Sequence, residues 1–358
     1  MLLDPVVIVR AVHFAACTVA MGTLVLAQLG GSGIATGRRF RWLALAALAV
    51  AGVSGAVWLL LIARNILDVP FAEVFDDGNL TAVALETRFG RIACLRLGLT
   101  LSAGALLLWR GAGWPSLLAA TGVIGSVALT DHAGAGTGTA GLIHMFSDVV
   151  HLAAAGAWLG ALPALAWLLL WGRNEPARGD LAADVTRRFG ALALVAVAAL
   201  LASGVINTAI LVGWPADLFA TTYVGALALK IGLFAAMLVL AAFNRFHLTP
   251  ALPRRGALGL LAATVLAETA LGLGILLLVG LLGTQPPAAH VHTSSAALNR
   301  EGAHVHIHTS QAMADLIVAP GRTAPLRQQS RFGTGTTGRS PPIASGSLSN
   351  RWRAAARP

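Results

Sequence analysis

The segment HMFSDVVHLAAAGAWLGALP, residues 144–163, joins polar side chains to a long apolar stretch. From Leu152 onward it consists mainly of Ala, Leu, Gly and Trp, a composition typical of a helix inside a membrane. Its first turns nevertheless carry two imidazoles, a thioether and a carboxylate, from His144, Met145, Asp148 and His151. The segment therefore predicts a membrane helix that begins in polar surroundings.

The composition of the whole chain agrees with this interpretation. Of its 358 residues, 56% are hydrophobic and only 11% are charged, and the mean hydropathy is +0.75. Soluble domains contain about 25% charged residues, so the chain is predicted to be an integral membrane protein. Its partners would then include the lipid bilayer. The net charge of +10 comes from arginines in short loops and a basic tail, which indicates membrane topology rather than nucleic-acid binding.

Apolar runs of suitable length predict an all-α polytopic bundle of about eight transmembrane helices. The runs cover residues 6–29, 42–63, 91–109, 115–130, 149–171, 189–213, 223–243 and 257–283. The fourth run is short and begins at Pro115. The first is interpreted as a retained helix rather than a signal peptide, because Asp4 precedes any arginine and no small-residue cleavage pattern follows.

The distribution of Lys and Arg predicts which side of the membrane each loop occupies. Arginines fall in the loops after the first, third, fifth and seventh runs, whereas loops 131–147 and 214–222 contain neither Lys nor Arg. The positive-inside rule then places both termini outside, which is the periplasm in a bacterium.

Beyond the last run the composition changes twice. Residues 1–284 form the predicted transmembrane domain, and residues 285–322 form a short His-rich periplasmic segment with a strand-like piece at 303–309. Residues 323–358 are rich in Ser, Gly, Pro and Arg and predict a disordered basic tail.

Three groups of side chains could bind a metal ion. His144, Asp148 and His151 are spaced i, i+4, i+7 and share one helix face at the outer surface, with Met145 nearby; imidazole and thioether are suitable copper ligands. Polar capping of a helix N-terminus is the alternative. On the first helix His13, Cys17 and Met21 follow at i, i+4, i+8, a ladder suited to Cu(I), although simple core packing would also explain Cys17 and Met21.

The third group lies in the outer segment, where histidines alternate with other residues. Its members are His290, His292, His304, His306 and His308. Alternate residues of a strand point the same way, so the last three could grip Cu(II) or Zn(II); adventitious surface binding is the alternative.

Polar residues inside the predicted spans are expensive and mark candidate functional positions. They are Asn207, Lys230 and Glu268. Lys230, the only lysine of the chain, could pair within the bundle or extend toward the membrane surface, and Asn207 could join helices. No G-x-S-x-G, Walker or C-x-x-C pattern occurs, so neither an enzyme nor an ATP-driven pump is predicted.

Several of these segments resemble those of a known family. SDVVHLAAAGAWLGALPAL (147–165) is similar to the signature of the CopD copper-resistance family of bacterial inner-membrane proteins. VHFAACTVAMGTLV (12–25), LASGVINTAI (201–210) and LALKIGLFAAMLVLAAFNRFHLTPAL (227–252) support the resemblance. The tail HVHIHTSQAMADLIVAPGR (304–322) is similar to the start of the extra periplasmic domain in the fused, YcnJ-like form.

The resemblance implies a multi-pass protein of the bacterial inner membrane that serves copper homeostasis. It implies movement of copper ions from periplasm to cytoplasm, or copper tolerance alongside a CopC-type periplasmic binding protein. Asp148, His151 and Trp158 occupy fixed positions of the signature, whereas Asn244 and Arg245 match a loop motif with an implied structural role. After Pro325 the chain departs from the family pattern, so its outer β domain is predicted to be incomplete.

The residues and the resemblance together predict an inner-membrane copper importer or copper-tolerance protein. The outer histidines would collect ions, and His144, Asp148 and His151, with His13 opposite, would take them up. Two alternatives stay open: a haem-b electron carrier in which His13 and His151 ligate one iron, and a copper sensor or partner-docking protein that transports nothing.

Overall fold

The computed structural model describes residues 4–31, 37–130, 138–212, 222–252, 254–284, 303–308, 313–318 and 328–333. The chain divides into two units, residues 1–288 and 289–358. The first unit is helical, and the second contains a small sheet.

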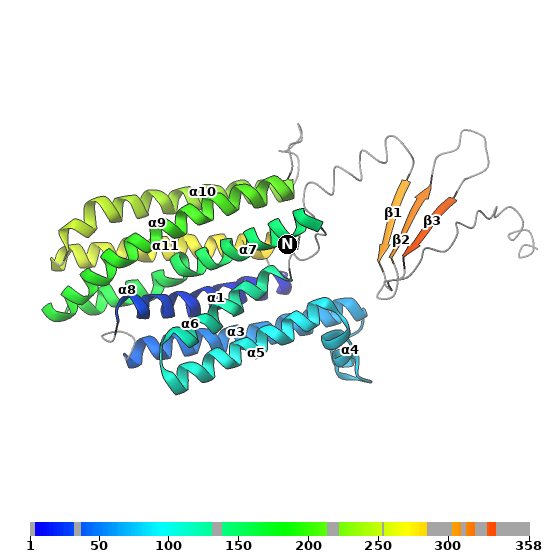
Figure 1. Cartoon of the computed structure of the whole chain (residues 1–358), viewed down its shortest axis with the longest axis horizontal. Coiled ribbons are helices and arrows are strands. Elements are labelled where there is room, and N and C mark those ends of the chain that lie inside the picture. The colour runs from blue at the N-terminus through cyan, green and yellow to red at the C-terminus, as the bar shows by residue number, and fades with distance from the viewer. Residues whose placement is uncertain are drawn as a thin grey trace, which may run out of the picture. The chain divides into compact units, whose positions relative to one another are not determined.

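Long helices form the first unit (Figure 1). They are α1 (Pro5–Leu29), α3 (Arg38–Leu67), α5 (Arg88–Arg110), α6 (Trp114–Ala128), α7 (Gly138–Trp158), α8 (Leu162–Gly172), α9 (Pro176–Val212), α10 (Thr222–Phe243) and α11 (Arg255–Leu282). Short elements join them: η1 (Phe71–Phe75), α4 (Asn79–Glu86), η3 (Leu159–Ala161), a π-helical turn η5 (Asn244–Leu248) and η6 (Thr249–Ala251).

In the described part of the chain, seven helical segments are long and apolar enough to cross a membrane, one of them being α7 continued through η3 into α8. This confirms the predicted polytopic bundle. The remaining predicted span corresponds to α6, which has 15 residues. Such a helix is about 22 Å long, shorter than the roughly 30 Å hydrocarbon core, so α6 does not meet the length of a full span.

Helix α1 lies at the centre of the bundle and packs against α3, α6, α7, α8 and α11. Its closest approach is to η3, where a Cβ on Gly22 would lie 2.0 Å from the backbone carbon of Gly160. Only glycine allows two backbones to come this close. At the start of α1, Arg10 Nη1 donates a hydrogen bond of 3.0 Å to the carbonyl of Gly283. The beginning of α1 and the end of α11 therefore lie at the same end of the bundle.

Two predicted loops are largely helical. Helix α7 begins at Gly138 rather than near 149, so residues 138–147 are not a loop, and the helix is interrupted by η3 before Pro163 starts α8. Helix α9 begins at Pro176 rather than near 189. The added turns contain ion pairs between residues one helical turn apart, such as Asp184–Arg188 at 2.7 Å, whose side chains are exposed. Such pairs stabilise a helix, so the polar composition of these residues is compatible with helix formation.

The second unit contains an antiparallel sheet in the order β1-β2-β3, with β1 (Ala303–His308), β2 (Met313–Val318) and β3 (Gln328–Gly333). Strand β1 confirms the strand expected at 303–309. In its register His304, His306 and His308 pair with Ile317, Asp315 and Met313. Strand β3 lies within the range predicted to be a disordered tail; backbone pairing with β2 orders these six residues although they lack an apolar alternation. His290 and His292 lie outside the described residues, and the predicted boundaries 1–284, 285–322 and 323–358 stay predictions.

Candidate functional site

Polar side chains of α7 and α9 meet inside the membrane-spanning part of the bundle. His151 Nδ1 lies 2.9 Å from Ser203 Oγ, and Asn207 Nδ2 donates a 3.2 Å hydrogen bond to Asp148 Oδ1. We call these four residues the α7–α9 polar group. Two of its members, Asp148 and His151, were predicted as ligands, and Asn207 was predicted to join helices, as it does here.

The hydrogen bonds of Ser203 fix the tautomer of neutral His151. Ser203 donates its single hydroxyl hydrogen to the carbonyl of Ala199, 2.5 Å away, so it can only accept from the imidazole. Nδ1 of His151 must then carry the ring hydrogen, which leaves the lone pair on Nε2. This is the arrangement in which a protein orients a histidine toward a metal ion. Helix α9 also passes close to the ring at Gly204, where a Cβ would make an ordinary contact of 3.7 Å with His151 Cε1.

Lys230 of α10 belongs to the same neighbourhood. Its ammonium interacts electrostatically with the carboxylate of Asp148 and with the ring of His151. The side chain is half-buried, so it does not lie free in the lipid. The amine of Lys230 therefore lies near the carboxylate of the α7–α9 polar group.

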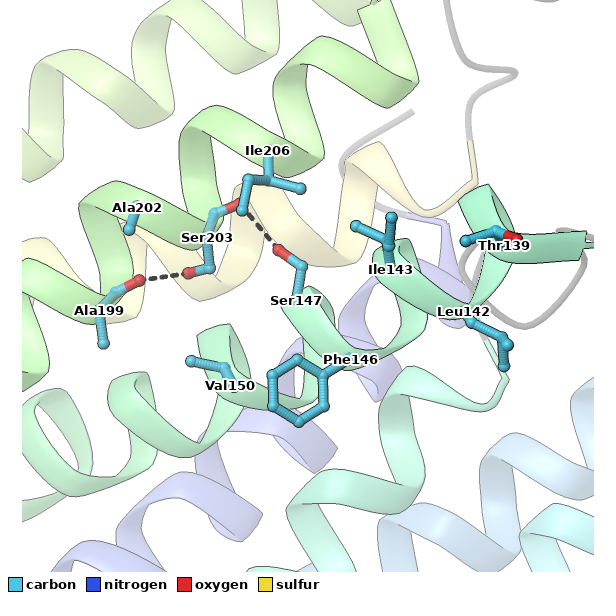
Figure 2. A pocket seen from close by; sticks show the side chains of 10 residues that line it. All are labelled: Thr139, Leu142, Ile143, Phe146, Ser147, Val150, Ala199, Ala202, Ser203 and Ile206. Carbon is cyan, nitrogen blue, oxygen red and sulfur yellow. Dashed lines mark hydrogen bonds between the residues drawn. The ribbon is translucent and has the colours of Figure 1, made fainter.

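A groove between α7 and α9 runs behind this group, with a volume of about 410 Å³. Figure 2 shows that Ser147 points toward the backbone of Ser203, whose own hydroxyl points toward Ala199. Ser147 Oγ donates a 3.2 Å hydrogen bond to the carbonyl of Ser203. Phe146 and Leu142 line the groove and are mostly exposed, as side chains that face lipid would be. Most of the residues that line the groove are apolar, and Ser147 and Ser203 contribute polar groups to its wall.

His144 and Met145 lie nearer the start of α7. His144 is buried and Met145 is half-buried. Among the residues that the structure describes, no group of three or more His, Cys, Asp or Glu side chains lies close enough to hold a metal ion. The set of His144, Asp148, His151 and His13 is therefore not assembled around one centre here, and the ligand role of each stays a prediction.

The ladder predicted on α1 is present in part. His13 Nδ1 lies 3.0 Å from the carbonyl of Ala51, and its Nε2 lies 3.6 Å from the sulfur of Cys17. Since a carbonyl can only accept, Nδ1 carries the hydrogen and the Nε2 lone pair faces the thiol. Met21 continues along α1 and packs on α7, where a Cβ on Gly156 would lie 2.7 Å from its sulfur. His13 and Cys17 thus form a buried nitrogen–sulfur pair that suits Cu(I).

Two buried arginines beside this pair were missed by the sequence reasoning. The guanidinium groups of Arg10 and Arg96 lie 5.1 Å and 5.3 Å from the centroid of the Trp58 ring, which in turn is 5.7 Å from that of His13. Arg96 also donates to the hydroxyl and carbonyl of Ser126. Both arginines fall inside predicted apolar runs, and a charged residue at such a position indicates a functional or structural role that could have been noted from the sequence. Their charge opposes a divalent cation at His13 more strongly than a monovalent one.

A second polar group lies toward the other end of α10 and α11. Asn244 Nδ2 donates to Glu268 Oε1 at 2.5 Å, and Thr264 donates to Asn244 Oδ1 at 2.6 Å. Glu268 is 2% exposed and lines a cavity of about 210 Å³, which we call the Glu268 cavity. Asn244, for which only a structural role was implied, is therefore a direct partner of the buried carboxylate. Cys94 is half-buried on α5.

The fold and these sites define a class of protein: a polytopic helical membrane protein with ionisable and soft-ligand side chains buried between its helices. Residues 1–142 match the model of the copper resistance protein D-like N-terminal domain, and residues 183–282 match that of copper resistance protein D. The chain belongs to the copper resistance protein D family.

Several relatives are similar over long stretches. The inner membrane protein YebZ of Escherichia coli is 32% identical, over 65% of this chain and 82% of the relative. Copper resistance protein D of Pseudomonas syringae is 29% identical, over 61% and 73%. The copper transport protein CutJ of Bacillus subtilis is 35% identical over 40% of this chain but only 26% of its own length. No solved structure matches the chain.

Proposed function

We propose that the protein carries copper ions from the periplasm to the cytoplasm across the bacterial inner membrane, as a transporter and not as an enzyme. Its family is one of copper resistance, and the relative CutJ is named a copper transport protein. The observation that carries the proposal is the oriented imidazole of His151 beside the carboxylate of Asp148, because a nitrogen lone pair and a carboxylate inside a bundle can bind a cation.

In the absence of copper, Lys230 would compensate the negative charge of this site. A carboxylate buried between helices is costly unless a positive charge accompanies it. Lys230 supplies that charge through its interaction with Asp148. An arriving copper ion would take over the carboxylate, and the ammonium would move aside; the two cations would compete for one anion.

The continuation of the path follows α7 and α1. Trp158 lies seven residues beyond His151, about 10.5 Å along the helix, and contacts the ring of Phe234 with centroids 5.9 Å apart. Trp158 also lines the Glu268 cavity, so α7 carries both the polar residues Asp148 and His151 and a wall residue of that cavity. His13 and Cys17 on α1 are the proposed soft ligands for copper in its reduced state, and the outer histidines, with a CopC-type protein as partner, would deliver the ion.

The alternatives differ in what they require of the two imidazoles. A haem-b carrier needs the Nε2 atoms of His13 and His151 to face one iron, whereas Nε2 of His13 lies 3.6 Å from the sulfur of Cys17. This contact gives the haem hypothesis no support. A copper sensor would bind the ion at the same residues without moving it, so only a flux measurement separates the two.

The deciding experiment is copper uptake into proteoliposomes that contain the full chain, with zinc measured in parallel. We expect copper uptake that His151→Ala reduces at least about tenfold, because the proposed ligand is lost. The matched control is His247→Ala, an exposed histidine stacked on Phe243 with ring centroids 5.2 Å apart. Uptake by neither wild type nor control, despite copper binding, would identify a sensor; unchanged uptake by His151→Ala would remove His151 from the site.

A further inference from the structure

The Glu268 cavity lies where α9 and α10 stand apart. Its walls come from α9 and α10, and α8 and α11 contribute Leu162, Leu165 and Val265. Trp158 of α7 lines the cavity, which also reaches Arg187 and Arg245 at the arginine-rich end of the bundle. It therefore connects the interior of the bundle with the end that carries the positive loops.

Glu268 is the one carboxylate among the described residues that line this cavity. Its oxygen Oε1 accepts from Asn244, which is held in turn by Thr264, so the side chain has a fixed orientation. The second oxygen, Oε2, is not used by that bond. A buried carboxylate in mainly apolar walls is costly as an anion, and protonation removes that cost.

The other charged groups that line the cavity are Arg187 from α9 and Arg245 from η5. Arg245 Nη1 is held by the carbonyl of Gly190 at 2.9 Å. The lining residues from α7, α8 and α10 do not titrate, and Lys230 of α10 interacts with Asp148 instead. The charge state of Glu268 thus depends on its own burial and on the hydrogen bond from Asn244.

The donor set of the cavity favours a proton over a metal ion. A copper ion prefers several nitrogen or sulfur ligands, and the described lining residues include no His, Cys or Met. A proton needs only one oxygen. The two arginines would also repel a divalent metal ion more strongly than a monovalent charge.

We propose that Glu268 is a proton-exchange site, which takes up and returns a proton through its cavity at the arginine-rich end while copper moves. In the uptake step hydronium gives its proton to Oε2, an O–H bond forms, and water is released; the return step is the reverse, and no electrons change hands. The link to copper movement rests on the proposed transport function, whereas protonation of Glu268 does not.

Chemical labelling tests the protonated state directly. Dicyclohexylcarbodiimide attacks protonated carboxyl groups in apolar surroundings, and mass spectrometry of the full chain in lipid nanodiscs locates the adduct. We expect labelling of Glu268, falling about tenfold per pH unit once the carboxylate form dominates. The exposed carboxylates of Asp184 and Glu175 serve as internal controls and should stay unlabelled. No labelling of Glu268 at acidic pH, or labelling that does not change with pH, overturns the proposal.

Proteoliposomes with a trapped pH indicator test the coupling. Glu268→Gln can still accept the hydrogen bond of Asn244, so the fold should persist while the pH change that accompanies copper uptake is lost. Glu268→Asp should retain part of that pH change. A pH change of wild-type size in Glu268→Gln overturns the proposal even if copper uptake is intact. Failure of copper uptake in the wild type, with Glu268 still labelled in a pH-dependent way, instead overturns the proposed function and leaves the proton site standing.

Discussion

His151 of α7 and Ser203 of α9 are joined by a 2.9 Å contact between Nδ1 and the hydroxyl oxygen. Because the hydroxyl hydrogen of Ser203 goes to the carbonyl of Ala199, the contact holds the imidazole with its Nε2 lone pair unused by this bond. The second helix thus sets the chemistry of a side chain on the first.

Removing this contact should weaken copper binding without removing a ligand. We expect Ser203→Ala to weaken copper binding about tenfold, the lower end of the range for losing the partner of a metal-binding histidine. Isothermal titration of the purified chain with copper would measure it. Ser147→Ala is the matched control, because the hydroxyl of Ser147 donates to the carbonyl of Ser203 rather than contacting an imidazole. Equal copper affinity in Ser203→Ala and Ser147→Ala would contradict the assigned role.

Lys230 and Asp148 should behave as a coupled pair. Lys230→Met leaves the carboxylate without its positive neighbour, so we expect a lower melting temperature in detergent and tighter copper binding, since the competing cation is gone. Adding Asp148→Asn should recover much of the stability. A double-mutant cycle should give a coupling free energy of about 1–3 kcal/mol, in the usual range for contacting residues. Additive effects of the two substitutions would mean that the charges do not interact.

The sequence allowed the class of fold to be predicted, and the reason is the period and length of its apolar runs. Helix ends were predicted less well: α7 starts eleven residues before the predicted 149, since the polar turn containing His144 is still helical. Hydropathy measures preference for lipid, whereas a helix continues as long as its backbone hydrogen bonds are satisfied. This is also why the charged start of α9 was taken for a loop.

For the site, contacts within one helix could be predicted from residue spacing, whereas contacts between helices could not. The ladder of His13 and Cys17 could be predicted from an i, i+4 pattern. The pairing of Asp148 with Asn207, by contrast, joins residues 59 positions apart, and the partner of Glu268 was not identified. Such pairs depend on which helices become neighbours, and one sequence without contact information does not specify that.

Cys17 and Cys94 offer a test of the Cu(I) ladder. Cys17 is buried 3.6 Å from His13 Nε2, whereas Cys94 is half-buried on α5. We expect Cys17→Ser to weaken Cu(I) binding about tenfold, because a hydroxyl is a harder ligand than a thiolate. Competition with a chromogenic Cu(I) chelator under reducing conditions would measure the affinity. Cys94→Ser should leave it unchanged; an equal loss in both variants would point to general destabilisation rather than to ligation.

The contact between Gly22 of α1 and Gly160 of η3 should limit what the centre of the bundle tolerates. A Cβ on Gly22 would lie 2.0 Å from the backbone of Gly160, so Gly22→Ala must push α1 away from η3 and from the helices on either side. We expect a loss of about 1–3 kcal/mol or more in unfolding free energy, the usual cost of overpacking, measured by thermal unfolding in detergent. Gly98→Ala on α5 is the control: a Cβ there meets nothing within 4 Å, so the better helix propensity of alanine should leave stability equal or slightly higher. If Gly22→Ala were as stable as Gly98→Ala, α1 and η3 would not be in backbone contact, and the central position of α1 would have to be abandoned.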